Sequence, residues 1–510
     1  MPKKTLKAAR VRRLRRGQKV QAATSTNGSG SGGLDVLAWE NDPYAQSRPT
    51  RPPALAAPVV RPIPDLNAKA LPVMIAGSTP KPRRYNAGTT EFRYWTAADA
   101  LRRTADFWAP LLPSGTNWHS TVGTRLRVSL DVGEDLNAYY DRRGLDFFHG
   151  SAGRMIVYSG ESPDVVCHEF GHAVLDALRP QLWNAATAEA AAFHESFGDM
   201  SALLAALQLQ SVRERVLLDT QDRLYHNSQL SRLAEQLGWA IRQSYPDAVE
   251  SDCLRNAVNS FFYKDPTGLP PEAPASLLSS EPHSFSRVFT GAFFEGLAGI
   301  FDTFGAATEK NLQQASVDAA KLLIKAIQTA PVVPSYYSQI AAAMMRSAPV
   351  THHQALAGAF MRHGILSPES AHTAGVAGPE SPRTVAGMVN LAQAAEDLPT
   401  APIACSEYGL GIDSIMMHVA SQPKRFNVAG AAPEAGSLTP PAHDEAAKSF
   451  LEDLLRLGRI DLKAAIGNRA GFLLQHPLRR KTHMLVKMSG GLALKRIHFD
   501  CGFACASRHG

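Results

Sequence analysis

Charged side chains, cysteines and long apolar runs are all scarce in this chain of 510 residues. Asp, Glu, Lys and Arg together make up only 19% of the sequence, which is on the low side for a soluble protein. No apolar stretch approaches the roughly 18 residues of a membrane helix, so we expect no transmembrane segment. The five cysteines are odd in number and too few for a disulfide framework. They are Cys167, Cys253, Cys405, Cys501 and Cys505, and the sequence does not decide whether the last two pair.

We also expect no secretory signal in this sequence. Nine of the first nineteen residues are Lys or Arg and no acid precedes Asp35, but no apolar h-region follows this basic start. These nine exceed the whole net charge of +7, so the remainder is slightly acidic. A block of like charges is typically a solvated arm, and we expect contact with nucleic acid or an anionic surface only through it. The sequence leaves the location open between the cytoplasm and export without a classical signal peptide.

Composition and apolar periodicity divide the chain into four parts. Residues 1–87 are rich in Pro, Gly, Ser and basic residues, and we expect a disordered tail there. Residues 88–367 combine helical and strand-like patterns, 368–400 have a linker composition, and 401–510 are expected to form a small domain of unknown role. Helical spacing occurs at 92–112, 164–178, 188–209, 285–303, 309–328, 336–347, 353–363 and 443–457, and strand-like runs at 126–130, 154–158 and 483–498.

The central feature of the sequence is the run His168-Glu169-Phe170-Gly171-His172. Side chains four positions apart lie on one face of a helix, so both imidazoles can reach the same metal ion. Glu169 is then placed to take a proton from a water on that metal. Alone, the pattern also fits an ordinary helix that carries two histidines, because three fixed positions often coincide by chance.

A catalytic zinc site needs a third protein donor and leaves its fourth position to water. Downstream, Glu195 and Asp199 are four residues apart and fall on one face of the next predicted helix. Glu195 can complete the metal site, and Asp199 can accept the N–H of a ligating histidine and so fix its tautomer. Glu189 is a weaker candidate for the third ligand, since no acid lies four residues after it.

Together these residues resemble the zinc-binding core of the thermolysin family of metallopeptidases. The resemblance rests on 164–174 and the two acids of the next helix, and it extends over about 88–367. It implies an α+β fold with two lobes, in which the zinc helix runs along the cleft between a sheet-containing N-terminal lobe and a helical C-terminal lobe. It also implies one catalytic Zn²⁺ bound by His168, His172 and Glu195.

Further residues occur in the order that the family has them. Asn137 and Ala138 stand where the family's edge strand pairs with the substrate backbone, a form of β-augmentation. Arg255 resembles the arginine that binds the substrate carbonyl. Twenty-eight residues later, His283 resembles the histidine that stabilises the oxyanion, and Glu281 is a candidate to orient it.

The remaining matches concern specificity and departures from the family. Val165 and Leu254 align with the apolar pocket for the residue after the cut, which predicts cleavage before bulky hydrophobic residues. Trp183 replaces a tyrosine that donates to the oxyanion, so we expect oxyanion stabilisation to rest more on His283. The acidic cluster that the family uses for calcium is missing after the third ligand, so the sequence does not support a calcium site. Asp164 is then left to serve its own helix.

The sequence therefore predicts a zinc-dependent endopeptidase that acts on peptides or proteins, with Glu169 as general base. Two other functions stay open. A catalytically inactive relative would bind peptides or a partner protein without cutting them, and the Trp183 substitution leaves room for it. A delivered effector or toxin protease would use the basic tail and 401–510 for export or targeting.

Overall fold

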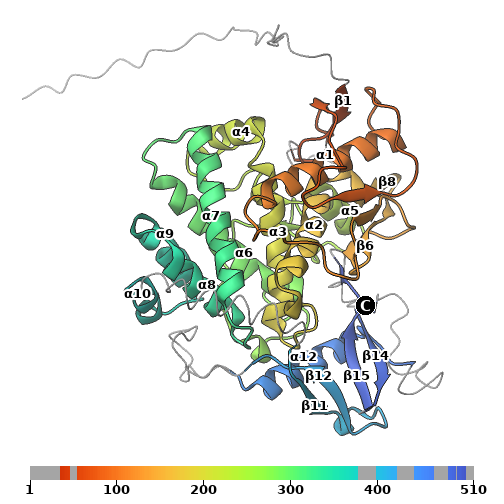
Figure 1. Cartoon of the computed structure of the whole chain (residues 1–510), viewed down its shortest axis with the longest axis vertical. Coiled ribbons are helices and arrows are strands. Elements are labelled where there is room, and N and C mark those ends of the chain that lie inside the picture. Colours follow the sequence, from red (N-terminus) through yellow and green to blue (C-terminus); the bar gives the residue numbers. More distant parts are fainter. Residues whose placement is uncertain are drawn as a thin grey trace, which may run out of the picture.

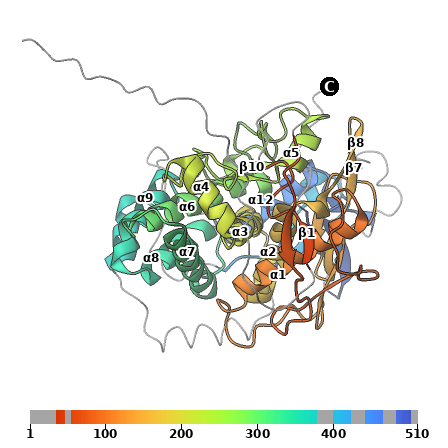
Figure 2. The same cartoon turned by 90° about the horizontal axis from the view of Figure 1, so that it is seen from above.

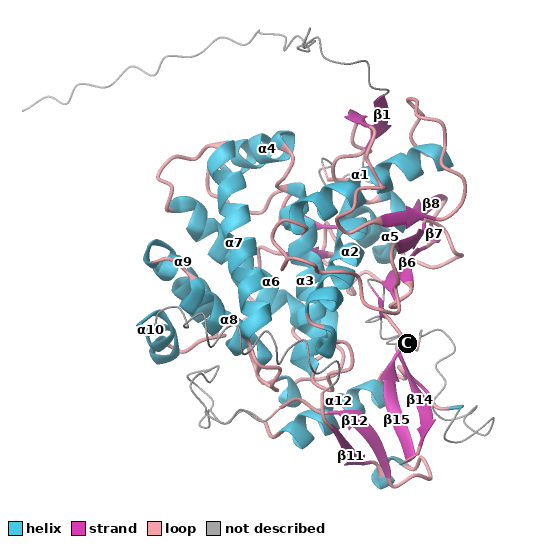
Figure 3. Cartoon of the chain, viewed as in Figure 1, coloured by secondary structure: helices cyan, strands magenta, loops and turns pink. Residues whose placement is uncertain are grey.

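The computed structural model describes residues 35–45, 54–376, 398–421, 441–463, 481–489 and 491–500. Within these ranges the chain is a mixed α and β protein, in which helices gather on one side while strands form one sheet beside them and another below (Figure 3). The basic segment 1–34 and the pair Cys501 and Cys505 lie outside the described residues. The other three cysteines are free and buried. None of the described helices is both long and apolar enough to cross a membrane.

The main sheet has the strand order β16-β5-β6-β4-β3. Strands β3, β4 and β6 run parallel to one another. Strand β5 runs antiparallel to β6, and β16, at the edge of the sheet, runs antiparallel to β5. Alternation along β4 buries Leu126 and Val128 on the core side. The strands are β3 Val73–Ile75, β4 Leu126–Ser129, β5 Ala138–Tyr140, β6 Gly144–Phe147 and β16 Phe499–Asp500.

Helices α1 and α2 lie next to this sheet, α1 against β3 and α2 against β5 (Figure 1). Helix α1 (Thr90–Trp108) begins after Thr89, whose hydroxyl accepts a hydrogen bond from the Phe92 amide. Helix α2 (Pro163–Leu178) begins with a proline, whose missing N–H would be unpaired at this position in any case. The two histidines of the sequence motif are thereby brought close to the β5 edge.

The folded part begins earlier than the sequence predicted. Strands β1 (Asp35–Ala38) and β2 (Val59–Pro62) form an antiparallel pair, β1 contacts α1, and β3 belongs to the main sheet. The prediction of a disordered tail over 1–87 is therefore wrong for 35–45 and 54–87. These strands are too short to give a clear periodicity, and their apolar residues are buried only because later parts of the chain cover them.

The helical part is built around α3 (Ala188–Ala206), which contacts α2 on one side and α6 on the other (Figure 2). Residues 189–206 are all buried, as expected for a helix surrounded by others. Gly364, with a φ of 68°, follows His363 at the end of α9 and takes the left-handed conformation that often terminates a helix. The other helices are α4 Gln210–Thr220, α5 Glu235–Arg242, α6 Pro282–Asp302, α7 Glu309–Thr329, α8 Tyr336–Ser347 and α9 Val350–Arg362.

Two short strand pairs complete this part of the chain. Strands β7 (His149–Ala152) and β8 (Met155–Tyr158) form a hairpin, which confirms the predicted strand at 154–158. Strands β9 (Arg232–Leu233) and β10 (Arg255–Asn256) pair in antiparallel orientation. The second pair places Arg255 at a defined position beside the helices.

The appended C-terminal part forms a second sheet of strand order β11-β12-β15-β14-β13, with helix α12 against β11. The predicted helix near 443–457 and strands near 483–498 are confirmed. The predicted linker over 368–400 is wrong at its start, where α10 (Pro368–Val376) contacts α8 and α9. The elements are β11 Thr400–Ala404, β12 Ser414–His418, α12 His443–Arg456, β13 Ile460–Asp461, β14 His483–Met488 and β15 Gly491–Arg496.

The C-terminal sheet, drawn in blue in Figure 1, is bonded to the main part of the chain. The Ala186 amide donates to the His418 carbonyl at 2.9 Å. The Arg496 guanidinium donates through Nε to the Trp183 carbonyl, also at 2.9 Å. Both contacts involve the segment between α2 and α3, so they hold the ends of β12 and β15 close to the two helices that carry the candidate site.

Candidate active site

Helix α2 carries both histidines of the motif as buried side chains. Its residues Val165, Val166 and Phe170 are buried in the main core, which fixes the rotation of the helix. His168 is 2% exposed and His172 is fully buried. Their rings meet edge to face with centroids 4.8 Å apart. Buried imidazoles need polar partners, and these come from α3.

Two glycines allow α2 and α3 to cross closely. A Cβ on Gly198 would lie 2.6 Å from Nδ1 of His168, and a Cβ on Gly171 would lie 2.8 Å from Cβ of Ser201. Both separations are well below van der Waals contact, so neither position has room for a side chain. No local pattern in the sequence indicates a role for either glycine, because the need for space appears only when the two helices are placed together.

Glu195 of α3 faces both histidines, as predicted. Its Oε2 lies 3.4 Å from Nε2 of His168, and its Oε1 lies 3.7 Å from Nε2 of His172. Zinc in tetrahedral coordination, with bonds of about 2.0–2.1 Å, needs donor atoms roughly 3.3–3.5 Å apart. Glu169 belongs to the same cluster, with a carboxylate oxygen within 4.8 Å of a ring nitrogen of each histidine.

The donor atoms of this cluster lack hydrogen-bond partners within the described part of the chain. These atoms are Nε2 of His168, Nε2 of His172, Oε2 of Glu195 and both carboxylate oxygens of Glu169. Buried polar atoms are rarely left unpaired in native proteins. Two imidazole nitrogens and a carboxylate are a donor set that zinc accepts, so the residues present fit a zinc ion.

The alternative third ligand, Glu189, lies elsewhere. Its Oε1 accepts a hydrogen bond from the Tyr263 hydroxyl at 2.7 Å, and its Oε2 accepts one from the Tyr337 amide at 2.7 Å. Both oxygens are therefore used in joining α3 to other parts of the helical region. Of the two glutamates of α3, Glu195 is the one that faces the histidines.

Asp199 lies one turn beyond Glu195 and fixes His168. Its Oδ1 lies 3.0 Å from Nδ1 of His168, the contact that the sequence predicted. Arg255 grips the same carboxylate from the other side, with Nε 2.9 Å from Oδ2 and Nη2 2.7 Å from Oδ1. A carboxylate held in this bidentate manner accepts the Nδ1–H of His168 and leaves Nε2 directed at Glu195. Arg255, predicted to bind substrate, is 6% exposed and is bonded to Asp199.

His172 has a partner that the sequence analysis missed. Nδ1 of His172 lies 3.3 Å from Nδ1 of His194, and both rings are fully buried. When His172 donates its Nδ1–H to His194, its Nε2 keeps a lone pair for a metal. The signal was present, since His194 directly precedes Glu195, but adjacent residues on a helix point in different directions.

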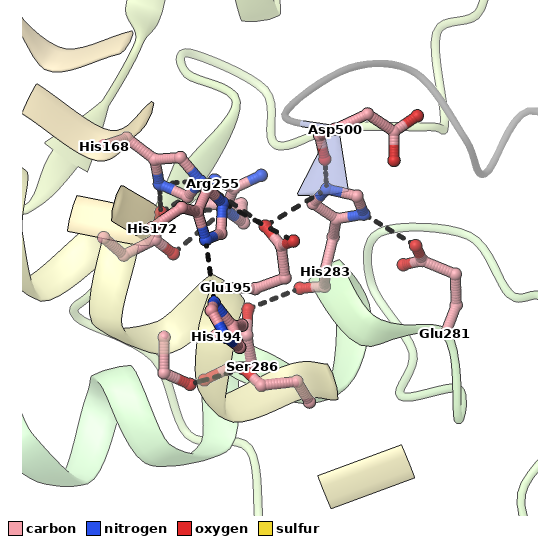
Figure 4. Close-up of polar contacts among 12 residues, drawn as sticks. His168, His172, His194, Glu195, Arg255, Glu281, His283, Ser286 and Asp500 are labelled. Atoms are coloured by element: carbon pink, nitrogen blue, oxygen red, sulfur yellow. Dashed lines mark hydrogen bonds and ion pairs between the residues drawn. The ribbon is translucent and has the colours of Figure 1, made fainter. Parts of the chain in front are cut away.

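His283, at the start of α6, reaches the site from the opposite side (Figure 4). Its Nε2 lies 3.2 Å from Oε2 of Glu195. Its Nδ1 lies 2.6 Å from Oε1 of Glu281, which confirms Glu281 as the residue that orients the ring. Nε2 of His283 also contacts the backbone carbonyl of Asp500.

Burial and neighbouring charges shift the titration of these groups. Burial raises the pKa of Glu169 to about 8, against the attraction of His168. Burial acts to lower the pKa of His168, but the nearby carboxylates of Asp199 and Glu195 outweigh it and raise that pKa to about 9. Burial and the neighbouring His168 hold the pKa of His172 well below its usual range. A metal ion at this site would therefore meet a neutral His172 and would compete with a proton on His168.

The predicted substrate edge lies beside the cluster. Asn137 is 4% exposed, and its Oδ1 accepts a hydrogen bond from the Ala138 amide at 2.9 Å. Trp183 follows the short 3-10 helix Pro180–Leu182, and its ring meets those of Tyr140 and Phe499 edge to face. One side of β5 pairs with β6, and its other side pairs with β16, which lies at the C-terminal end of the described chain.

The predicted apolar pocket is not open to a substrate here. Val165 and Leu254 are 1% and 6% exposed and belong to the main core. A cavity does lie beside the site, but its lining includes Glu195, His283 and Phe499 of strand β16 and does not include Val165 or Leu254. The preference for bulky residues after the cut therefore stays a prediction.

A second group of buried carboxylates lies at the beginning of α2. Oxygens of Asp42, Asp164 and Glu235 are within 4.8 Å of one another. Asp164 accepts a hydrogen bond from the Ala234 amide at 3.1 Å, so it also joins α2 to the segment before α5 and does more than serve its own helix. Burial raises the pKa of Asp42 to about 6 and that of Asp164 to about 7. Carboxyl groups this close share protons or hold a cation.

The structure brings most of the predicted site residues together. They are His168, Glu169, His172, Glu195, Asp199, Arg255 and His283. Comparison of the chain with known protein families and with curated proteins found no match. The candidate site therefore rests on its own geometry.

Proposed function

We propose that this chain is a zinc-dependent endopeptidase of the thermolysin type, with the main sheet and the helical part as the two lobes beside the site. The observation that carries the proposal is the convergence of donors, in which the Nε2 atoms of two histidines lie 3.4 and 3.7 Å from one carboxylate. His168, His172 and Glu195 would hold the metal. When bound there, Zn²⁺ polarises a water molecule and the scissile carbonyl.

Glu169 is the general base of the proposed reaction. Its carboxylate is fully buried, and within the described chain neither oxygen has a hydrogen-bond partner that would compete for a proton. Burial disfavours its ionised form, but a cation a few ångströms away favours it. A carboxylate oxygen of Glu169 takes a proton from the attacking water. Glu169 then passes this proton to the leaving amine.

The remaining residues position the reacting groups. Nε2 of His283 donates a hydrogen bond to the oxygen of the scissile carbonyl as negative charge develops there, while Glu281 accepts from Nδ1 and keeps the ring in place. Strand β5 binds an extended peptide by antiparallel pairing. Arg255 acts through Asp199 on His168, so it is a positioning residue.

A peptide-binding protein without catalytic activity is the second candidate. One observation favours it, namely that a strand of the chain itself already occupies the β5 edge. Such a protein needs the edge and the surrounding rings but has no use for a general base. The two candidates therefore differ in how they respond to a change at Glu169.

The test compares metal content and peptide cleavage in the wild-type chain and Glu169→Gln. Because β16 covers β5, both are also prepared with Phe499→Ala, which loosens that strand. We expect about one zinc per chain in every variant, and chelator-sensitive cleavage only where Glu169 is present. Glu189→Gln is the matched control, since Glu189 is also a buried glutamate whose pKa burial raises to about 8. Zinc binding without any cleavage supports the peptide-binding candidate, and absence of zinc refutes the proposal.

A further inference from the structure

The last described residues of the chain occupy the edge where a peptide substrate would pair. Strand β16 runs antiparallel to β5, with Phe499 opposite Tyr140 and Asp500 opposite Tyr139. An extended peptide that adds to a sheet edge gains affinity from main-chain hydrogen bonds, whatever its sequence. The segment 498–500 therefore takes the position of a bound peptide.

Phe499 is buried among the rings of the candidate site. Its ring stacks on His194 with centroids 4.0 Å apart and on His172 with centroids 5.2 Å apart. Trp183 meets it edge to face at 5.3 Å, and the Arg496 guanidinium lies 3.9 Å from its centroid. Only 2% of Phe499 is exposed, so its side chain covers a candidate metal ligand and the ring that supports it.

The two neighbours of Phe499 are held as well. The carbonyl oxygen of Asp500 accepts a hydrogen bond from Nε2 of His283, the donor assigned above to the substrate carbonyl (Figure 4). The Asp500 carboxylate lies 3.4 Å from Nη1 of Arg459. The ring of His498 stacks on that of Tyr139, with centroids 4.7 Å apart. Each of the three residues of 498–500 therefore contacts a different set of side chains, as the residues of a bound peptide do in a binding site.

The segment is delivered to the site by a short tether. Only Ile497 and His498 separate β16 from β15. The end of β15 is bonded to the α2–α3 loop through Arg496, from its amide to the Asn184 side chain at 3.3 Å and from Nε to the Trp183 carbonyl at 2.9 Å. A ligand on a short linker reaches an effective concentration on the order of millimolar, so a free peptide competes poorly with it.

We propose that His498–Asp500 is an intramolecular peptide ligand of the candidate active site, and that the appended C-terminal sheet holds it there so that the site stays closed until this segment is displaced. The occupancy itself does not depend on catalysis, whereas the closure of an active enzyme rests on the proposed peptidase function. The proposal also gives 401–510 the role that the sequence left open. The ligand chemistry is that of an extended peptide in which an aromatic residue directly precedes the residue whose carbonyl contacts His283.

The experiment uses the full chain with Phe499→Ala, which removes the buried ring, and Phe499→Pro, which also removes an amide from the strand. Met484→Ala is the control, because Met484 is a large apolar residue of the same C-terminal sheet but is 40% exposed on β14. Amides of an antiparallel strand point alternately to its two neighbours, so hydrogen exchange at Tyr139 and Tyr140, which pair with β16, reports whether β16 is in place. This measurement requires neither zinc nor activity. Circular dichroism shows whether each variant is folded.

We expect the amide of Tyr139 or Tyr140 that is directed at β16 to be protected in wild type and Met484→Ala and to exchange at least tenfold faster in the Phe499 variants, since protection follows from strand pairing. Cleavage of a fluorogenic peptide should rise at least tenfold in the same variants. The synthetic peptide LKRIHFD, which corresponds to 494–500, should suppress that gain, and the same peptide with Phe replaced by Ala should do so much less.

The outcomes separate this inference from the proposed function. Faster exchange without any cleavage by zinc-loaded Phe499 variants supports the intramolecular ligand and counts against the peptidase. Equal exchange in all folded chains, with cleavage already high in wild type, overturns the intramolecular ligand and leaves the peptidase standing.

Discussion

Gly198→Ala adds one methyl group to α3 at the point where this helix contacts His168, a candidate metal ligand. The new methyl group would lie 2.6 Å from both Nδ1 and Cε1 of His168. The ring has little room to retreat, because it is 2% exposed and its Nδ1 is held 3.0 Å from Asp199. The substitution therefore pushes directly on the imidazole that is proposed to bind zinc.

Two effects of this substitution have opposite signs. Replacing glycine by alanine within a helix stabilises by roughly 0.5–1 kcal/mol. Overpacking a filled interior costs typically 1–3 kcal/mol, and here the nearest atoms all belong to the His168 ring, which its bond to Asp199 holds in place. We expect overpacking to win, with a net loss of about 1–2 kcal/mol in the free energy of unfolding. Displacement of a ligand should also lower zinc affinity by ~10–100-fold.

Zinc titration against a competing chelator measures the affinity, and denaturant unfolding of the metal-free chain measures stability. Gly358→Ala on α9 is the matched control, because the nearest atom to its Cβ is in the guanidinium of Arg362, at 3.0 Å, at the end of a long and exposed side chain. It should gain helix propensity and leave zinc affinity unchanged. If Gly198→Ala binds zinc as tightly as wild type, then His168 either does not bind the metal or does not lie against Gly198.

Three other outcomes follow from the site and its surroundings. His194→Ala should weaken zinc binding about tenfold, because His172 loses the acceptor that fixes its tautomer, and His194→Asn, whose amide oxygen can accept, should recover part of the loss. The pKa of Asp164, about 7 in the folded chain, lies above the value of about 3.9 in an unfolded one. Its contribution to stability is therefore complete below pH 4 and is lost as the pH rises towards 7. Over that range the free energy of unfolding of Asp164→Asn should increase relative to that of wild type, by at most about 1.4 kcal/mol per pH unit. Thermal unfolding at pH 5 and pH 8 with a chelator present tests this, and an equal difference at both values would contradict it. Removing zinc from the wild-type chain with a chelator should lower its melting temperature, because only the folded chain brings the three donors together.

The sequence predicts the helices of this chain well and its short strands poorly. The helix predicted at 336–347 has those bounds, and the one at 164–178 differs by a single residue at its start. Helical periodicity of apolar residues over several turns is easy to recognise in a sequence, because one face of the helix is buried in the folded chain. Strands β1 and β3 have four and three residues, too few to distinguish from the Pro-rich segments around them.

The same contrast holds within the candidate site. Helical spacing is enough to place His168 with His172 and Glu195 with Asp199, and the structure adds that the two pairs face each other. The contacts of His194 and Gly198 depend on how α2 and α3 cross, which no local pattern contains. The pairing of Tyr139 with Asp500 joins residues that are far apart in the sequence, and a two-residue strand has no periodicity that could reveal it.

The most direct test of the central claim is zinc content and peptide cleavage in the chain with Phe499→Ala, with and without Glu169→Gln. About one tightly bound zinc in both chains, with chelator-sensitive cleavage only when Glu169 is present, is the predicted result. Cleavage that persists in Glu169→Gln, or the absence of zinc from both chains, would contradict the account.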